Sequence, residues 1–270
     1  MTFYENNNID YTSEIMKMAS SMNPGRSNLS AITPISQYSP IKYNSVNVAV
    51  GRRGSGKTHA FMKEFIRIGE ASSRTHMLIY VSKNLNVVDP TFEKFRDLIP
   101  IPIEIVEAEF FEEYIKNIIM YKEYYEKIIE QDVVDDLTDD LVEEFQQVLK
   151  IKDFSERGLH TLIFIDDCVF SSLLTQKSYV TSLLSENRQP RLSFFLSIQF
   201  WKGLIPSIKP NINTLFVFGS FSKQQLSYIL QQIPLNTSFD VFHQMYRQLN
   251  NRCHVIIDTD EGCYRTELSQ

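Results

Sequence analysis

The sequence predicts an α/β protein with a mostly parallel sheet flanked by helices and a β-hairpin at the C-terminal end. Apolar runs of strand length alternate with segments of helical periodicity from Val46 to Leu249. Strands that alternate with helices favour parallel pairing, with helices on both faces of the sheet. The last two apolar runs instead flank Asp260-Glu261-Gly262, a turn sequence that predicts an antiparallel hairpin.

The strands are expected where short apolar runs lie between turn signals. Pro102 near the start of the third run favours an edge position, because proline cannot donate to a neighbouring strand. The expected strands are Val46–Val50, Met77–Val81, Ile101–Val106, Leu162–Ile165, Leu192–Ile198, Leu215–Phe218, Val255–Asp258 and Cys263–Arg265.

Helices are expected between these strands, where apolar residues recur at helical spacing. Gly69 is expected to end the first helix, Asp89-Pro90 precedes a short one, and Ser222 with Gln225 forms a capping box. The expected helices are Lys57–Ile68, a short helix containing Phe92 and Phe95, the region 109–150, Gln176–Leu184, a helix from Ser222, and Phe239–Leu249.

We expect two parts in the chain: an N-terminal arm at 1–44, with one short helix near Ser13–Met22, and a main domain at 45–270. Within the domain, 109–150 is predicted to be a helical insert with tyrosines on one of its faces. The acidic cluster in the middle of the insert lacks the glycine and the terminal glutamate of a calcium-binding loop. It is therefore predicted to be a solvated turn between two helices.

Length, charge and cysteine content limit the possible functions. A chain of 270 residues suits one α/β domain with additions. With a net charge of −6, any DNA contact would need a local basic patch or a pore formed by several subunits. Three cysteines without zinc spacing favour a reducing compartment, and no apolar run approaches the ~20 residues that span a membrane. We expect an intracellular protein with no membrane span.

A phosphate-binding loop follows the first strand. Val46–Val50 leads into Gly-x-x-x-x-Gly-Lys-Thr, the P-loop pattern between a strand and a helix. The glycines let successive backbone N–H groups point inward and form an anion-binding nest. Lys57 is expected to reach the β- and γ-phosphates and Thr58 to offer its hydroxyl to Mg²⁺. The residues expected to contact a nucleotide are Gly51, Arg52, Arg53, Gly54, Ser55, Gly56, Lys57, Thr58 and His59.

Two adjacent carboxylates, Asp166 and Asp167, end the buried run Leu162–Ile165. Two acids at the end of an apolar strand are unfavourable unless a cation or solvent compensates them. The pair therefore favours a metal site over an exposed turn. From their order alone, we assign a water-mediated Mg²⁺ contact to Asp166 and polarisation of the attacking water to Asp167.

The strand Leu192–Ile198 is flanked by two further candidates. Gln199 at its end could bond the γ-phosphate or the attacking water, although a satisfied structural glutamine is the alternative. Arg188, just before the strand, could reach the nucleotide of a neighbouring subunit, although it could also be an ordinary surface arginine. Arg52 and Arg53 are unusual inside such a loop and could contact phosphate, a neighbouring subunit or DNA.

In order along the chain, these motifs resemble the genome-packaging ATPases of large double-stranded DNA viruses and virophages, the poxvirus-type branch of the FtsK/HerA superfamily. The resemblance spans about Val46 to Asp258. Besides the P-loop, the acids and Gln199, it includes Asn211-Ile212-Asn213-Thr214 and Asn250-Asn251-Arg252. It implies a RecA/FtsK-HerA-like P-loop NTPase fold and ATP and Mg²⁺ as cofactors. The catalytic residues that it implies are Lys57, Asp167, Gln199 and Arg188.

The resemblance also implies a motor that uses ATP to move double-stranded DNA into a capsid during virion assembly. Its partners would be DNA, further copies of the chain in a ring, and a capsid vertex or portal-type protein, in the host cytoplasm or the virion. Trp201, Lys202 and Lys209 are candidates for DNA contact. A small-molecule kinase and a nucleotide-stabilised structural virion component remain alternatives, although the chain has no arginine-rich lid of the kind that kinases carry.

Overall fold

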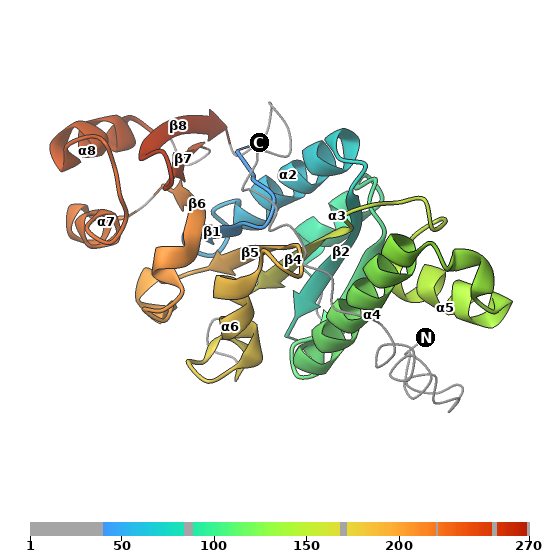
Figure 1. Cartoon of the computed structure of the whole chain (residues 1–270). Helices are drawn as coiled ribbons and strands as arrows, with labels where there is room; N and C mark the ends of the chain where they lie inside the picture. Colours follow the sequence, from blue (N-terminus) through green and yellow to red (C-terminus); the bar gives the residue numbers. More distant parts are fainter. Residues whose placement is uncertain (1–39, 84–88, 168–171, 220, 250–252, 269–270) are drawn as a thin grey trace.

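The computed structural model describes residues 40–83, 89–167, 172–219, 221–249 and 253–268. The helix expected near Ser13–Met22 lies outside these residues. Eight strands form one sheet in the order β3-β2-β4-β5-β1-β6-β7-β8 (Figure 1). Every pair from β3 to β6 is parallel, whereas β7 pairs antiparallel with β6 and with β8. The predicted fold class, a mostly parallel sheet with a C-terminal hairpin, is confirmed.

The strands extend beyond the apolar runs that predicted them, because polar residues also pair at their ends. Thr75 pairs with His160 where β2 and β4 begin. The strand bounds are β1 (Val46–Val50), β2 (Thr75–Ser82), β3 (Ile103–Glu107), β4 (His160–Asp166), β5 (Leu192–Ile198), β6 (Ile212–Phe218), β7 (Cys253–Asp258) and β8 (Cys263–Leu268). As Pro102 predicted, β3 lies at an edge of the sheet.

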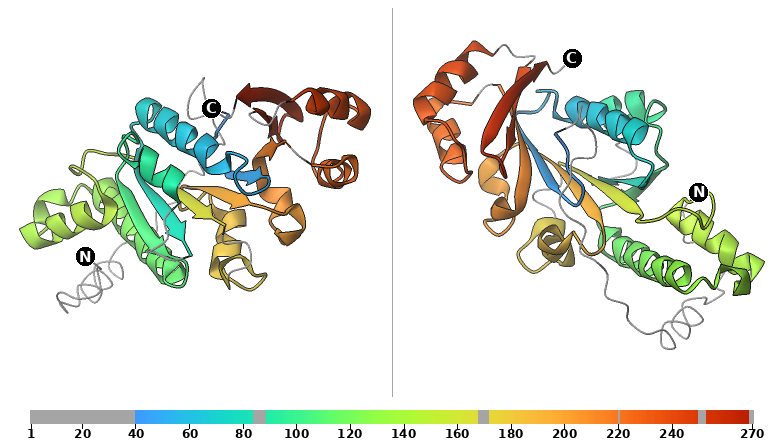
Figure 2. Two further views of the ribbon diagram at one scale, coloured as in Figure 1. Left: turned by 180° about the vertical axis from the view of Figure 1, so that it is seen from behind. Right: turned by 45° about the horizontal axis from the view of Figure 1, so that its top comes forward.

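Helices cover both faces of the sheet, as the three views show (Figures 1 and 2). The first face carries α2 and α3; the second carries α4, α6, α7 and α8. The helix bounds are α2 (Lys57–Ala71), α3 (Pro90–Arg96), α4 (Phe111–Gln131), α5 (Asp139–Leu149), α6 (Tyr179–Glu186), α7 (Lys223–Leu230) and α8 (Phe239–Gln248). The predicted start of α6 at Gln176 is too early, because Ser178 caps the helix by accepting from the Thr181 N–H.

The helix that follows the P-loop is fixed to the sheet by aromatic packing. Phe61 of α2 is fully buried, and its ring meets those of Phe164, Phe195 and Phe216 edge-on at centroid distances of 5.6, 5.3 and 5.3 Å. These three rings belong to β4, β5 and β6, on either side of β1. The N-terminus of α2 is therefore held firmly at the end of β1.

The expectation that Gly69 ends α2 is wrong. The helix continues to Ala71, and the Ser72 N–H closes it by donating to the Ile68 carbonyl at 2.8 Å. A Cβ on Gly69 would lie 2.7 Å from side-chain atoms of both Pro100 and Ile101. Glycine is needed here for the close approach of the chain after α3, so its role is in packing.

The region 109–150 is helical, as expected, and its helices α4 and α5 share a small core of their own. Tyr121 and Tyr125 of α4 pack against Phe145 of α5, so the tyrosine face is a packing face. Between the helices, Asp132 has a left-handed φ of 54° and Thr138 caps α5. Asp132 and Asp135 of the acidic cluster thus lie between the two helices, as predicted, whereas Asp139 and Asp140 form the first turn of α5.

The last residues of the expected arm pack on the domain. Ile41 is fully buried, and the Lys42 ammonium lies 2.9 Å from Asp258 and 2.8 Å from Asp260. These carboxylates belong to the end of β7 and the turn before β8. The chain entering β1 is therefore tied to the C-terminal hairpin.

Candidate nucleotide-binding site

A cavity of about 580 Å³ opens where β1, β2, β4 and β5 end. The carboxyl ends of parallel strands meet at one edge of a sheet, which is where ligands bind in open α/β folds. The lining residues come from the P-loop, from the ends of β2, β4 and β5, and from the start of α3: Arg53, Gly54, Lys57, Thr58, Tyr80, Ser82, Lys83, Asp89, Pro90, Asp166, Asp167, Ser197 and Gln199.

The P-loop has the backbone that its glycines permit. Gly54 and Gly56 have left-handed φ values of 74° and 96°, which side chains with a Cβ rarely adopt. At Gly51 the constraint is space, because a Cβ would lie 2.7 Å from the Phe218 Cβ and 2.7 Å from the Ser55 Oγ. The loop is therefore seated tightly against the end of β6.

Lys57 lies inside the loop. Its ammonium donates to the carbonyls of Gly51 at 2.9 Å and Arg52 at 3.0 Å. Burial lowers its pKa, while the carboxylates of Asp166 and Asp167 act in the opposite direction. A partly desolvated cation at the N-terminus of a helix suits a phosphate group.

Asp166 has the environment expected of a metal-binding carboxylate. Burial raises its pKa to about 6, and the neighbouring charges of Asp89 and Asp167 act in the same direction. A cation beside it would relieve this unfavourable ionisation. Thr58 lines the same cavity, and carboxylate and hydroxyl oxygens are ligand types that suit Mg²⁺. The residues present therefore fit a magnesium ion held by Thr58 and Asp166.

The structure brings Asp167 and Gln199 into direct contact. The Gln199 amide nitrogen donates to both Asp167 carboxylate oxygens, at 2.9 and 2.7 Å. Asp167 has a left-handed φ of 52°, and its N–H donates to the Ser197 carbonyl at 3.2 Å. The carboxylate is exposed at the cavity rim, where it can accept a proton from water.

Six predicted residues do not line the cavity: Gly51, Arg52, Ser55, Gly56, His59 and Arg188. Arg188 is exposed before β5, about 20 Å from the carboxyl end of that strand at ~3.3 Å per residue. It therefore cannot reach the cavity of its own chain. The His59 ring packs edge-on against Phe95 at 5.0 Å, and neither His59 nor Arg52 lines the cavity.

Sequence reasoning missed Tyr80, Asp89 and Ser197. The Tyr80 hydroxyl donates to Asp166 at 3.2 Å, and the Ser197 side chain also bonds that carboxylate. Tyr80 lies near the end of β2, and Ser197 pairs with Asp166 across β4 and β5. Polar side chains at the ends of strands were the available signal, but their convergence depends on strand order.

The sheet, the P-loop and the acids at the strand ends define a P-loop ATPase fold. No protein-family model and no curated protein sequence matches the chain. Among solved structures, the DNA-packaging ATPase B204 from Sulfolobus turreted icosahedral virus matches with a TM-score of 0.52 at 17% identity, over 83% of this chain and 97% of its own. The resemblance to genome-packaging ATPases is thus confirmed at the level of the fold.

Two further structures share this fold. The genome-packaging NTPase B204 from Sulfolobus turreted icosahedral virus 2, in complex with ATPγS, matches with a TM-score of 0.52 at 18% identity, over 83% of this chain and 97% of its own. The cytoplasmic domain of the type VII secretion ATPase EccC from Thermomonospora curvata matches with 0.52 at 12% identity, over 83% of this chain and 25% of its own. In the described part of the chain, every helix is too short or too polar to cross a membrane.

Proposed function

We propose that this protein is an ATP-hydrolysing motor that translocates double-stranded DNA into a viral capsid during virion assembly. The observation that carries the proposal is the contact of Gln199 with Asp167 at the rim of a P-loop cavity. A binding protein needs only the loop, whereas hydrolysis also needs a group that activates water. The fold shared with a viral DNA-packaging ATPase supports the choice of motor.

In the proposed reaction, Lys57 turns from the loop carbonyls to the β- and γ-phosphates of ATP. Thr58 and Asp166 would hold Mg²⁺, which would neutralise phosphate charge. Asp167 accepts the proton of the attacking water, and Gln199 orients that carboxylate. In this proposal Gln199, which directly follows β5 and touches Asp167, changes its position when a γ-phosphate is present.

Arg188 acts, in this proposal, on the nucleotide of a neighbouring copy of the chain. It is exposed and lies at the amino end of β5, so it can serve only a cavity from outside its own subunit. In a ring of identical subunits, the Arg188 of each subunit can lie against the nucleotide cavity of the next subunit. The capsid partner is a vertex or portal-type protein, and the ring works at the viral assembly site in the host cytoplasm and in the virion.

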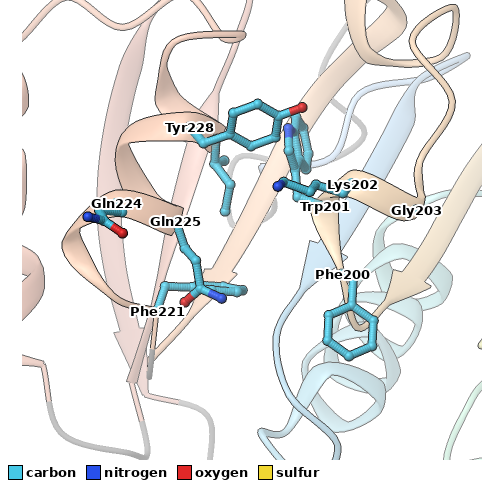
Figure 3. Close-up of a pocket in the computed structure, with 9 residues that line it drawn as sticks. Phe200, Trp201, Lys202, Gly203, Phe221, Gln224, Gln225 and Tyr228 are labelled. Carbon is cyan, nitrogen blue, oxygen red and sulfur yellow. The ribbon is translucent and has the colours of Figure 1, made fainter.

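The loop after Gln199 is the proposed DNA contact. Lys209 lies 5.3 Å from the Trp201 ring centroid, and Lys202 and Lys209 lie 5.4 and 5.8 Å from that of Tyr228. In the described part of the chain, neither lysine is paired with a carboxylate. Trp201, Lys202 and Tyr228 face a hollow of about 580 Å³ between this loop and α7 (Figure 3). These cations suit a DNA phosphate backbone, with salt-dependent binding and no base preference.

The test is ATP turnover with and without double-stranded DNA. We expect DNA to stimulate turnover, and K202A/K209A to reduce the stimulation while DNA-free turnover stays unchanged. K223A, on neighbouring α7 but paired with Asp240, is the matched control. Turnover that does not respond to DNA would contradict the motor.

The two alternatives give different outcomes in this assay. A kinase would consume ATP only with a small acceptor. A structural virion component would retain its assembly role in D167N. The Arg188 role is tested by mixing R188A subunits with K57A subunits, each of which is inactive alone. We expect turnover to return in the mixture, at interfaces where a K57A subunit supplies Arg188 to the cavity of an R188A subunit, which still has Lys57. Failure of the mixture, or a protein that stays monomeric with ATP and DNA, would exclude the arginine role.

A further inference from the structure

Asp166 is held by a side chain that belongs to none of the sequence motifs. The Tyr80 hydroxyl, on β2, donates to the Asp166 Oδ2 atom at 3.2 Å. Tyr80 is only 1% exposed, so its ring belongs to the core, and the residue also lines the cavity.

The first turn of α3 fixes the position of Tyr80. The Phe92 ring stacks on the Tyr80 ring with a centroid distance of 4.0 Å and an interplanar angle of 10°. The Asp89 N–H also bonds the Tyr80 oxygen. The Asp89 side chain caps this turn, accepting from the N–H groups of Thr91 at 2.7 Å and Phe92 at 3.3 Å. The Tyr80 hydroxyl thus accepts from the Asp89 N–H and donates to the Asp166 carboxylate.

The two strands beside β4 hold the same carboxylate from opposite sides. β2 supplies Tyr80, and β5 supplies Ser197, whose side chain bonds Asp166. Groups that orient a metal-binding carboxylate in this way tune its affinity for the ion.

We propose that Tyr80 is a positioning residue, which holds the Asp166 carboxylate in the orientation that Mg²⁺ binding requires. The inference rests on the proposed function in one respect, that Asp166 serves the Mg²⁺ of a bound nucleotide. Tyr80 acts on the carboxylate directly, through its hydrogen bond to the Asp166 Oδ2 atom. Because Phe92 and Asp89 fix Tyr80, the placement of α3 determines the placement of this acid.

The test measures the Mg²⁺ dependence of ATPγS binding by calorimetry, without turnover. Y80F keeps the ring and its stacking on Phe92 but lacks the hydroxyl. We expect the Mg²⁺ concentration needed for half-maximal enhancement of binding to rise roughly 10-fold. ATPγS affinity in EDTA should stay at the wild-type value.

The matched control is Y125F. Tyr125 is equally buried, and its hydroxyl donates to the carbonyls of Asp153 and Glu156 in the separate core of α4 and α5. We expect its Mg²⁺ titration to match that of the wild-type protein. A similar shift in Y125F would mean that general loosening causes the effect, and it would overturn the inference.

Other outcomes are also decisive. An unchanged Mg²⁺ titration in Y80F overturns the role of Tyr80, as does an equal loss of ATPγS affinity with and without Mg²⁺. If Y80F does not fold, F92L provides the test, because it keeps the Tyr80 hydroxyl but loses the ring stacking on Tyr80. A Mg²⁺ titration of F92L that matches wild type would show that α3 does not position Asp166 through Tyr80. Failure of the wild-type protein to bind ATPγS would refute the proposed function itself.

Discussion

The side-chain nitrogen of Gln199 lies 2.9 and 2.7 Å from the two carboxylate oxygens of Asp167. Asp167 directly follows β4 and Gln199 directly follows β5, so the pair bridges the ends of two neighbouring strands at the cavity rim. The amide fixes the plane of a carboxylate that is otherwise exposed. This is the arrangement needed to aim a proton acceptor at a water molecule.

D167N should bind ATP but scarcely hydrolyse it. The substitution keeps the shape of the side chain and removes its ability to accept a proton, which lowers turnover by about 10²- to 10⁴-fold. Phosphate release measures turnover, and ATPγS calorimetry should give an affinity near that of wild type. D132N, at the distant end of α4, is the control and should behave as wild type. Normal hydrolysis by D167N would refute the assignment of the base.

K57A should lose nucleotide binding. The Lys57 ammonium lies inside the loop and ties it together through the carbonyls of Gly51 and Arg52. Binding to the folded state raises the melting temperature of wild type when ATPγS and Mg²⁺ are added, and this shift should disappear in K57A. K63A, on the same helix but outside the cavity, is the control and should keep the ligand-induced rise in melting temperature. A full shift in K57A would place the nucleotide elsewhere.

G69A should destabilise the protein, although alanine favours helices by about 1 kcal/mol over glycine. The added Cβ would meet Pro100 and Ile101 at 2.7 Å, and overpacking typically costs about 1–3 kcal/mol. Urea unfolding should therefore show a net loss of stability of up to about 2 kcal/mol. E70A, the next position but exposed, should be neutral or stabilising. A gain in stability in G69A would show that Pro100 and Ile101 move aside for the added Cβ at little cost.

Buried His254 should make the protein sensitive to acid. Its pKa is lowered to about 4, first by burial and then by the nearby cations Lys63, Arg265 and Arg67. Because the folded-state pKa lies below the unfolded value of 6.5, stability is fully present above pH 6.5. It falls as the pH drops toward 4, by up to about 3 kcal/mol.

H254F should flatten this decline because phenylalanine has no titrating group. Its ring can still stack on Phe218, whose ring centroid lies 4.7 Å from that of His254. Urea unfolding at pH 7.5, 6.0, 5.0 and 4.5 measures the effect. H254Q also lacks the titrating group, so it should show the same flattening despite its different packing. Some slope should remain in both variants, because burial also lowers the pKa of His76 to about 3. An acid decline as steep as that of wild type in both would exclude His254 as its source.

The sequence predicted those parts of the site that depend on local pattern. The P-loop needs glycines at fixed offsets, and Asp166 and Gln199 each follow an apolar run long enough to be a buried strand. The strands could be predicted because β1, β4 and β5 are covered on both faces, which makes their sequences continuously apolar.

What the sequence could not predict depends on contacts between distant segments. Gly69 has the appearance of a helix stop, and only the approach of Pro100 and Ile101 explains its presence inside α2. Tyr80 carries no motif, and it reaches Asp166 because β2 lies beside β4. The distance of Arg188 from its own cavity likewise follows from the direction of β5.

The position of β1 has a consequence for biosynthesis. Val46 pairs with Phe194 on one side and with Ile212 on the other, so both neighbours of the P-loop strand leave the ribosome long after it does. Until β5 and β6 emerge, β1 has two open edges, which are prone to pair with other chains. A nascent chain that stops before β5 should therefore need chaperones to stay in solution, and nucleotide can assist folding only once most of the chain has been synthesised.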